Sequence, residues 1–336
     1  MYNFNNFKGK NVLITGGAGF IGSNLAIKLV ELDANVTIID SLIPEYGGNL
    51  FNLELVKDKV KLNISDVRDE HSMKYLIRDH DYLLNLAGQT SHIDSMSNPY
   101  VDLDINARAQ LSILEACRRY NPSIKIVFAS TRQIYGKPRY LPVDENHPLC
   151  PVDINGINKM AGEWYHLVYN NVHKIKSVVL RLTNTYGPRM RVKDARQTFL
   201  GIWIKNVIEG KKILVFGDGK QIRDFNYVDD VTDAILLSAL SNEVNGMIFN
   251  LGAEDPINLE NTAKLLIEIS HKERYELVPF PSDRKAIDIG DYYADYKNIK
   301  TKLGWQPKIS LSEGLRLTID YYKKFNDHYW NENNNA

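Results

Sequence analysis

Short apolar runs rich in β-branched residues alternate with longer segments of helical periodicity through the first half of the chain. The runs read NVLITG, NVTIID, DYLLNLAG, KIVFAS and SVVLRLT, and the first two flank a helical segment from Phe20 to about Leu32. Strands that alternate with helices in this way are typical of βαβ units. The pattern therefore predicts an α/β fold of the Rossmann type, with a doubly wound parallel sheet.

The pattern loosens after Asn184, where the helical segments are separated by shorter strands. The expected helices are QTFLGIWIKNVIEG, DDVTDAILLSALS and NLENTAKLLIEISH, and the expected strands are KILVFG, GMIFNLG and YELVPF. We expect a Rossmann domain over residues 1–183, to which some later segments return. A smaller α/β substrate-binding portion is expected over 184–330, against the carboxyl edge of the first sheet, and a disordered tail over 331–336.

The amino-acid composition argues against several classes of function. The chain has 41 Lys and Arg against 41 Asp and Glu, so no net field attracts nucleic acid or an anionic membrane. Cys117 and Cys150 are too few and too far apart in sequence for a disulfide framework or a zinc site. Neither a signal peptide nor an apolar stretch long enough to cross a bilayer is visible, which favours a cytoplasmic protein.

A glycine-rich turn carries the strongest local signal. In NVLITGGAGFIGSNLAIKLV, the residues Gly16, Gly19 and Gly22 lie between a strand and a helix, where backbone amides and the helix dipole receive a pyrophosphate. Asp40 ends the next strand, at the place where a carboxylate accepts hydrogen bonds from the adenosine ribose. Because a carboxylate there repels a 2′-phosphate, the pattern favours NAD over NADP.

Several motifs in the same order resemble the extended short-chain dehydrogenase/reductase family of NAD-dependent nucleotide-sugar epimerases, dehydratases and decarboxylases. The resemblance runs from about residue 8 to residue 325. It rests on the segments ITGGAGFIGSNL, SDVRD, NLAG, FASTRQIYG, RLTNTYGPR, VFGDGKQIRDFNYVDDV and KTKLGWQPKISLSEGLRLTIDYY. It implies a Rossmann fold, a nucleotide-diphosphate sugar as substrate and, through two helices with several apolar faces, a homodimer.

The resemblance also implies roles for individual residues. The cofactor contacts it implies are Gly16, Gly19, Phe20, Ile21, Gly22, Asp40, Asp66, Val67, Ala87 and Lys159. The substrate contacts it implies are Gln89, Arg132, Gln133, Asn184, Arg189, Arg223 and Arg284, with Arg196 a weaker candidate beside Arg189. Arg223 and Arg284 match arginines that bind the diphosphate, and a planar guanidinium suits phosphate oxygens.

The catalytic residues implied by the family are Thr131, Asn155 and Lys159, and one of them departs from the usual pattern. Relatives use a tyrosine as the base that takes a proton from the sugar hydroxyl, four residues before the lysine. Here Asn155 stands at that position in PVDINGINKMAGEWY. A carboxamide neither gains nor loses a proton near neutral pH, so Asn155 can bind a hydroxyl but cannot deprotonate it.

Several side chains are alternatives to the missing tyrosine. His92 follows a cofactor strand, and histidine as a class exchanges protons near neutrality. Lys159 is a second alternative, acting through Thr131 or a water molecule. Tyr135 lies in the right region, although its family counterpart packs structurally. Tyr293 and Lys297 have the usual spacing but lie far along the chain from the cofactor strands.

These observations favour an NAD-dependent nucleotide-sugar epimerase that oxidises a ring hydroxyl transiently, at carbon 4. A 4,6-dehydratase is disfavoured, because Arg132 and Gln133 stand where such relatives carry Asp and Glu. A decarboxylase of the UDP-glucuronate type and a sugar-nucleotide dehydrogenase are the alternatives among enzymes. A catalytically impaired protein that binds NAD and a sugar nucleotide is the alternative outside them.

Overall fold

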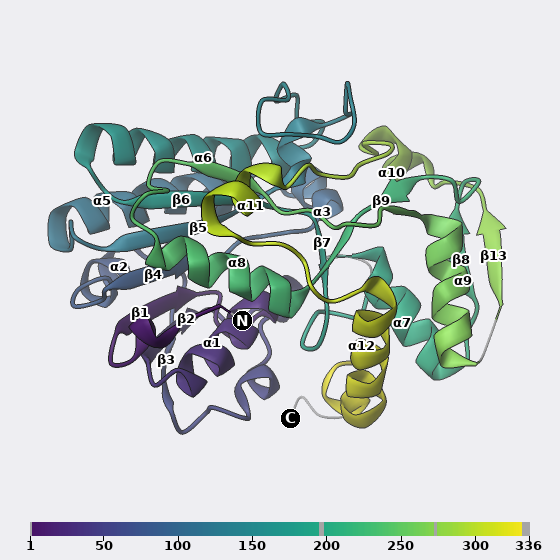
Figure 1. Ribbon diagram of the computed structural model, residues 1–336, viewed down its shortest axis with the longest axis horizontal. Helices are drawn as coiled ribbons and strands as arrows, with labels where there is room; N and C mark the ends of the chain where they lie inside the picture. The colour runs from purple at the N-terminus through teal and green to yellow at the C-terminus, as the bar shows by residue number, and fades with distance from the viewer. Residues whose placement is uncertain (1, 195–197, 272–273, 331–336) are drawn as a thin grey trace.

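A parallel sheet forms the centre of the molecule. The computed structural model describes residues 2–194, 198–271 and 274–330. Seven strands lie in the order β11-β6-β5-β4-β1-β2-β3, and each neighbouring pair is parallel (Figure 1). Their bounds are β1 Asn11–Thr15, β2 Asn35–Asp40, β3 Val60–Ile64, β4 Tyr82–Asn85, β5 Lys125–Thr131, β6 Ser177–Leu182 and β11 Ile248–Asn250. The predicted Rossmann-type fold is confirmed.

Helices cover both faces of this sheet, as its apolar strands require. On one face lie α2 Glu70–Leu76, α5 Ala109–Tyr120 and α6 Ile154–His173. On the other lie α1 Phe20–Glu31, α8 Val228–Leu240 and α11 Lys297–Leu303. The helix predicted from Phe20 to about Leu32 therefore ends one residue earlier than expected.

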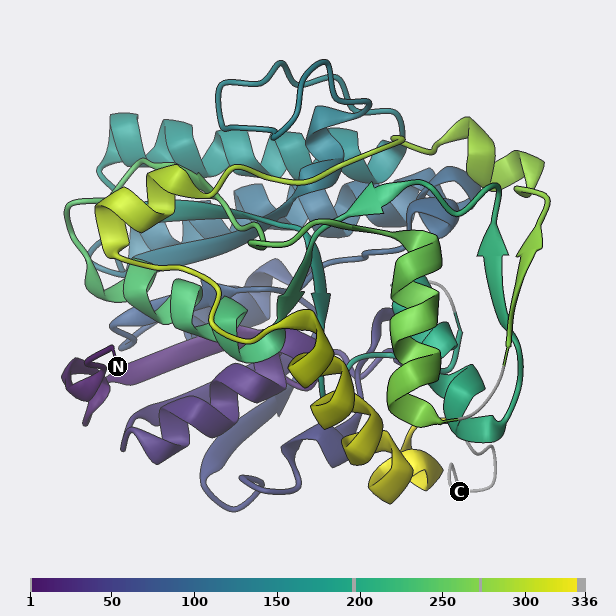
Figure 2. The ribbon, with the colours of Figure 1, turned by 45° about the vertical axis from the view of Figure 1, so that its right-hand side comes forward.

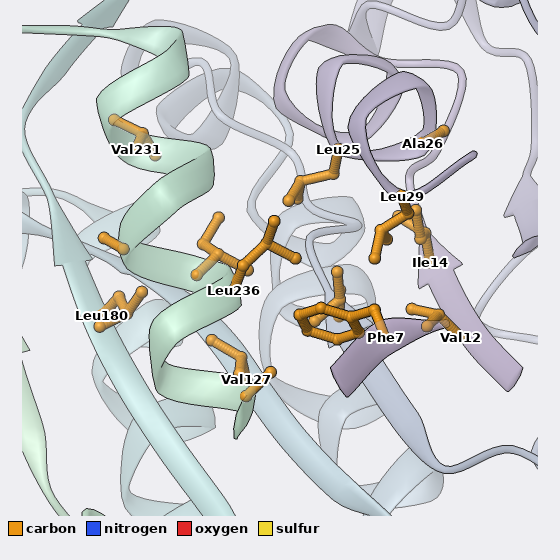
Figure 3. Close-up of a cluster of buried hydrophobic side chains, with 14 of the residues drawn as sticks. Phe7, Val12, Ile14, Leu25, Ala26, Leu29, Val127, Leu180, Val231 and Leu236 are labelled. Carbon is orange, nitrogen blue, oxygen red and sulfur yellow. The ribbon is translucent and has the colours of Figure 1, made fainter. Parts of the chain in front are cut away.

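The core between α1, α8 and the sheet is built from aliphatic side chains of distant segments (Figure 3). Leu25 and Leu29 of α1 meet Leu236 of α8 over Val127 of β5, and all four are buried. Burying one such side chain contributes roughly 1.5–3 kcal/mol. The packing explains why α8, from the second half of the chain, covers the first sheet, of which β11 is also a strand.

The remaining C-terminal segments form a second group of helices and short strands, which lies beside the carboxyl end of the large sheet (Figures 1 and 2). A separate core that includes Trp203, Leu266 and Tyr322 holds this group together. Its helices are α7 Phe199–Glu209, α9 Leu259–Ser270, α10 Ser282–Ala286 and α12 Leu311–Phe325. Its strand pairs are β7 Asn184–Tyr186 with β10 Phe225–Tyr227, β8 Ile213–Phe216 with β13 Tyr275–Val278, and β9 Ile222–Arg223 with β12 Ile257–Asn258.

Short helices connect β4 to α5 and pack against the start of α6. They are α3 His92–Ser97, α4 Pro99–Leu103 and a π-helical turn Asp104–Arg108 that continues into α5. The 3₁₀ turns are Asn5–Phe7, Pro44–Tyr46, Leu50–Leu53, Arg132–Tyr135 and Asn326–His328. In the described part of the chain, no helix is both long enough and apolar enough to cross a membrane. The predicted tail over 331–336 and the candidate Arg196 lie outside the described residues.

Candidate functional site

The turn between β1 and α1 is tight enough that glycines are required in it. Gly16 has a φ of +71°, and a Cβ added there would lie 3.1 Å from the Ala87 backbone. A Cβ added to Gly22 would lie 2.2 Å from the Gly16 carbonyl oxygen, so α1 packs directly on the turn. The first amides of α1, which have no partner within the helix, therefore border the adjacent cavity and suit a phosphate group.

Asp40, the last residue of β2, braces the same turn. Its Oδ2 accepts a hydrogen bond from the Ala18 amide at 2.9 Å and its Oδ1 accepts one from the Leu42 amide at 2.8 Å. Burial raises the pKa of Asp40, and these backbone hydrogen bonds act in the opposite direction. The carboxylate is thus held in one place at the cavity wall, where it suits the hydroxyls of a ribose.

The first cavity runs along the carboxyl ends of the central strands, where ligands bind in open α/β sheets. Its wall includes most of the residues expected to bind the cofactor or to act in catalysis. They are Gly16, Gly19, Phe20, Ile21, Gly22, Asp40, Asp66, Val67, Ala87, Thr131, Asn155 and Lys159. The structure therefore brings this predicted set together around one space.

A second cavity lies between the first and the C-terminal group of helices. Its wall is largely apolar, with Trp203 and Phe280, but it also includes five predicted substrate contacts, which are Arg132, Gln133, Asn184, Arg223 and Arg284. Burial lowers the pKa of Arg223 to about 10, and the nearby charge of Arg132 adds to this effect. Two arginines beside an apolar wall form a pocket suited to a diphosphate with an organic group attached.

Four residues line both cavities and so mark the place where they meet. They are His92, Arg132, Asn184 and Thr198. The Nη2 of Arg132 donates to the Asn184 Oδ1 at 3.0 Å, and the guanidinium lies 5.3 Å from the centre of the Tyr292 ring. The other terminal nitrogen, Nη1, is buried and has no hydrogen-bond partner among the described residues. A ligand that spans both cavities passes this junction.

Asn155 lies in the first turn of α6 with both amide hydrogens in use. Its Nδ2 donates to the Gln89 carbonyl at 2.8 Å and to the Asp102 Oδ2 at 3.0 Å. The other oxygen of Asp102 accepts from Asn158 at 2.8 Å, and the Asp102 side chain is fully buried. We call Asp102, Asn155 and Asn158 the amide cluster. It fixes part of the wall of the first cavity through Asn155, and its two side-chain amides neither gain nor lose a proton near neutral pH.

Lys159 lies one helical turn beyond Asn155. Its Nζ donates to the Ala129 carbonyl at 3.2 Å and lies against Gly88, where an added Cβ would come within 2.8 Å. Burial lowers the pKa of Lys159 to about 8, whereas the charge of Asp102 acts to raise it. Thr131, at the end of β5, accepts a hydrogen bond from the Gln133 amide at 3.2 Å, so its hydroxyl proton is directed elsewhere.

A second buried carboxylate lies at the start of the same helix. Asp153 caps α6 by accepting from the Gly156 amide at 2.6 Å, and its other oxygen accepts from the Gln133 Nε2 at 2.7 Å. The Nδ1 of His92 lies 3.0 Å from that oxygen, and a third of the His92 side chain is exposed. We call His92, Gln133 and Asp153 the imidazole cluster. It places a titratable group at the junction of the cavities.

Several candidates lie away from both cavity walls. Gln89 is buried and donates to the Ser91 carbonyl at 2.9 Å, and Arg189 donates to the Asn24 Oδ1 at 2.9 Å. Tyr135 is buried between Asn250 and Arg181, and burial raises its pKa to about 12. Neither Tyr293 nor Lys297 lines either cavity. Substrate contacts by Gln89 and Arg189 stay predictions.

Asp102 and Asp153 are the residues of the site that sequence reasoning missed. Asp153 had a readable signal, because an aspartate directly before a helical segment is typical of an N-cap. Asp102 had none, since an acidic residue in a short helix is usually exposed. Its burial depends on amides that lie more than fifty positions further along the chain.

The chain matches a known family along most of its length. Residues 13–318 match the family model described as GDP-mannose 4,6 dehydratase. A "Putative UDP-glucose 4-epimerase" of Methanocaldococcus jannaschii is 35% identical and covers 94% of this chain and 99% of its own. A dTDP-D-glucose 4,6-dehydratase of Homo sapiens is 31% identical and covers 96% of this chain and 92% of its own.

Solved structures of similar proteins have the same fold. A UDP-glucose 4-epimerase of Thermotoga maritima, solved with UDP-glucose, superimposes with a TM-score of 0.86 at 32% identity and covers 94% of this chain and 99% of its own. A UDP-glucose 4-epimerase of Thermus thermophilus, solved with NAD, has a TM-score of 0.83 at 30% identity and covers 93% of this chain and 99% of its own. The similarity extends over both cavities.

Proposed function

This chain belongs to the extended short-chain dehydrogenase/reductase family of NAD-dependent nucleotide-sugar epimerases and dehydratases, and from that premise we propose that it is a nucleotide-sugar epimerase. Its cofactor is NAD, as in the related structures that contain it. When bound, NAD takes a hydride from a ring carbon of the sugar and later returns it to the opposite face. The chain's own residues must then bind the sugar, orient it and move the hydroxyl proton.

The residues of the first cavity fit NAD. The close-packed glycine turn leaves space for a pyrophosphate at the start of α1, and Asp40 suits the adenosine ribose. Lys159 is buried deeper in the same cavity, where its cationic form favours ionisation of a nearby hydroxyl. The arginines of the second cavity, Arg223 and Arg284, would bind the diphosphate of the substrate.

The observation that carries the proposal is the meeting of the two cavities at His92, Arg132 and Asn184, in a space whose first cavity is also lined by Thr131 and Lys159. A sugar joined to a diphosphate in the second cavity reaches the first cavity only at this junction. Epimerisation needs the fewest groups there, because oxidation and reduction at one carbon require only one proton acceptor and one hydride acceptor. The reacting position that we propose is carbon 4.

Dehydration at carbons 5 and 6 needs an additional acid and base, and position 133 provides neither. The Gln133 side chain is an amide, and its Nε2 is already donated to Asp153. This supports epimerisation over 4,6-dehydration.

Decarboxylation is a second candidate because of Arg132. Its Nη1 is buried at the junction with no partner among the described residues, and a sugar carboxylate would satisfy it. A carboxylate that lies β to a newly formed ketone leaves as carbon dioxide with modest assistance. A nucleotide-activated uronic acid is therefore the substrate class to test beside neutral hexoses.

One panel of substrates separates these functions. Purified protein with NAD is incubated with UDP-, GDP-, CDP- and dTDP-hexoses and with UDP-uronates, and the products are identified by NMR. We expect an inverted ring carbon without loss of mass. Carbon dioxide release would select the decarboxylase, and accumulated NADH with a keto sugar would select a dehydrogenase. Binding without any product would instead identify a catalytically impaired protein.

We also propose that the protein forms a homodimer through α5 and α6. Both helices expose apolar side chains, among them Leu111, Trp164, Val168 and Val172, the last of which is 65% exposed. A contiguous apolar surface of this kind is typical of an interface. Light scattering measures the mass of the wild type in solution, and Trp164→Glu with Val168→Glu is expected to give the monomer mass.

A further inference from the structure

The proposed reaction lacks an identified proton acceptor, and this inference rests on that proposed function. Asn155 is unsuited, because both its amide hydrogens are donated within the protein and an amide does not ionise near neutral pH. Tyr135 lies outside both cavities and burial raises its pKa to about 12. Lys159 in its cationic form has no lone pair to offer. A side chain at the junction of the two cavities is the remaining candidate for a direct acceptor.

His92 has the position that this role requires. It is the first residue of α3, and Ser91 holds the start of that helix by accepting from the Asp94 amide at 3.1 Å. Within the described ranges, His92 and Arg132 are the titratable side chains that line both cavities. Since arginine stays protonated in proteins, the imidazole is the one of the two that can accept a proton.

The partner of His92 defines which nitrogen is available. Its Nδ1 lies 3.0 Å from the Asp153 Oδ2, and the Asp153 side chain is fully buried. Burial would raise the pKa of Asp153, but the contacts with His92, the Gly156 amide and Gln133 together lower it, so the group remains a carboxylate. Among the described residues this Nδ1 has no hydrogen bond of normal geometry, but a carboxylate at this distance would favour the tautomer with hydrogen on Nδ1 once the ring turns toward it, which leaves the lone pair on Nε2.

We propose that His92 is the catalytic base of this protein and that Asp153 positions it. In the oxidising step the ring hydroxyl gives its proton to the His92 Nε2, the carbon–hydrogen bond at the same carbon breaks with its electron pair leaving to NAD, and a carbon–oxygen double bond forms. The keto sugar then turns so that the other face of its carbonyl meets the cofactor, the hydride returns to that face, and the imidazolium gives the proton back to the oxygen, which inverts the carbon. Charge balances because the buried Asp153 carboxylate faces the transient imidazolium.

The arrangement explains the positions of Gln133 and Asn155 together. Gln133 donates to the same Asp153 oxygen that faces His92, so it holds the carboxylate without competing for the proton. Asn155 closes the opposite side of the turn, where Asp102 is joined to amides rather than to a titratable group. The base thus lies on the α3 side of α6 rather than on α6 itself.

The test begins with UDP-glucose, UDP-N-acetylglucosamine and UDP-glucuronate as probes of the NAD-loaded wild type. His92→Ala is expected to lower kcat by roughly 10²–10⁴-fold, the usual contribution of a positioned base, while the affinities for NAD and UDP stay within about threefold. His71→Ala is the matched control, since His71 is exposed on α2 and lines neither cavity. Added imidazole is expected to restore the His92→Ala rate by about tenfold or more, which a structural role would not allow.

Asp153→Asn tests the positioning residue, because asparagine also caps helices and should preserve α6. We expect kcat to fall by about tenfold with an unchanged KM, and the double variant with His92→Ala to be no slower than His92→Ala alone. His92→Gln gives a second variant if His92→Ala is poorly folded.

The possible failures are distinct. A wild type that converts no probe overturns the proposed function and this assignment with it. An active wild type whose His92→Ala and His92→Gln variants are equally fast overturns the assignment of the base alone. Loss of activity that imidazole fails to restore in a folded variant with normal NAD affinity also overturns it.

Discussion

Two buried carboxylates contact the first turn of α6, and they have different neighbours. Asp102 is joined to the side-chain amides of Asn155 and Asn158, whereas Asp153 is joined to an amide and to an imidazole that borders both cavities. The amide cluster stabilises a wall, because its two amides do not ionise near neutral pH and they occupy both oxygens of the carboxylate. The imidazole cluster has the parts of an acid–base pair. The difference shows that a buried carboxylate near a ligand cavity need not take part in a reaction. The side chains that contact the carboxylate decide whether it can.

Removing the carboxylate of the amide cluster should have the largest effect. Asp102→Leu leaves the buried amide hydrogens of Asn155 and Asn158 without an acceptor, which we expect to lower the free energy of unfolding by about 4 kcal/mol. Urea denaturation measures the change. Asp104→Leu is the control: that side chain is 43% exposed and 3.9 Å from Arg108, so its loss should matter little. An equal loss of unfolding free energy in both variants would show that the hydrogen bonds of Asp102 contribute no more to stability than the exposed Asp104 side chain does.

Placing the tyrosine expected from the family at position 155 is the next test. Asn155→Tyr introduces a ring where the side chain is almost fully buried, and it removes two hydrogen bonds. We expect kcat to fall about 30-fold, together with about 2 kcal/mol of stability. Ile157→Tyr, at a 45% exposed position of the same helix, controls for the added ring. A faster Asn155→Tyr enzyme would mean that the amide cluster is an impaired version of the family site.

The pH dependence of the rate tests the charge of the amide cluster through its effect on Lys159. Because burial lowers the pKa of Lys159 to about 8, its cationic form is lost as the pH rises through that value, and the bound positive charge of NAD can only lower it further. We expect kcat to decrease above pH 8 by about tenfold per pH unit. Removing the negative charge of Asp102 in Asp102→Asn should move this alkaline decrease to lower pH. An alkaline decrease that persists unchanged in Lys159→Arg would assign it to another group.

The smallest effect is expected for Gln133. Gln133→Leu removes one donor from the Asp153 carboxylate and leaves its contacts with His92 and Gly156. We expect kcat to fall about fivefold, which corresponds to about 1 kcal/mol. Gln306→Leu, at an exposed position far from both cavities, is the control for steady-state kinetics. A loss as large as that of His92→Ala would give Gln133 a direct part in the reaction.

Local patterns were sufficient for the elements that build the cofactor cavity. The apolar run that ends in Asp40 and the glycines from Gly16 to Gly22 predicted a strand, a turn and a helix, and the structure has β2, the tight turn and α1 at those places. This was possible because strand burial, turn geometry and helix periodicity depend on residues within about twenty positions of one another.

The candidate site was only partly predictable, for a physical reason. The side chains of Asn155 and Asp102 are 53 positions apart in sequence, and His92 contacts a carboxylate at position 153. Hydrogen bonds between such distant segments produce no repeating pattern in the sequence. Each residue looks like an ordinary polar residue within its own segment.

The sequence by itself determined the parallel α/β fold and the glycine turn beside Asp40, and it predicted that Asn155 stands where relatives carry a tyrosine. Tertiary structure alone decided that Asn155 is closed off by Asp102, and that His92 faces Asp153 where the two cavities meet. The physical reason is that backbone hydrogen bonds and apolar periodicity act locally, whereas the availability of a lone pair or a proton depends on which distant side chains the folded chain places within 3 Å of it.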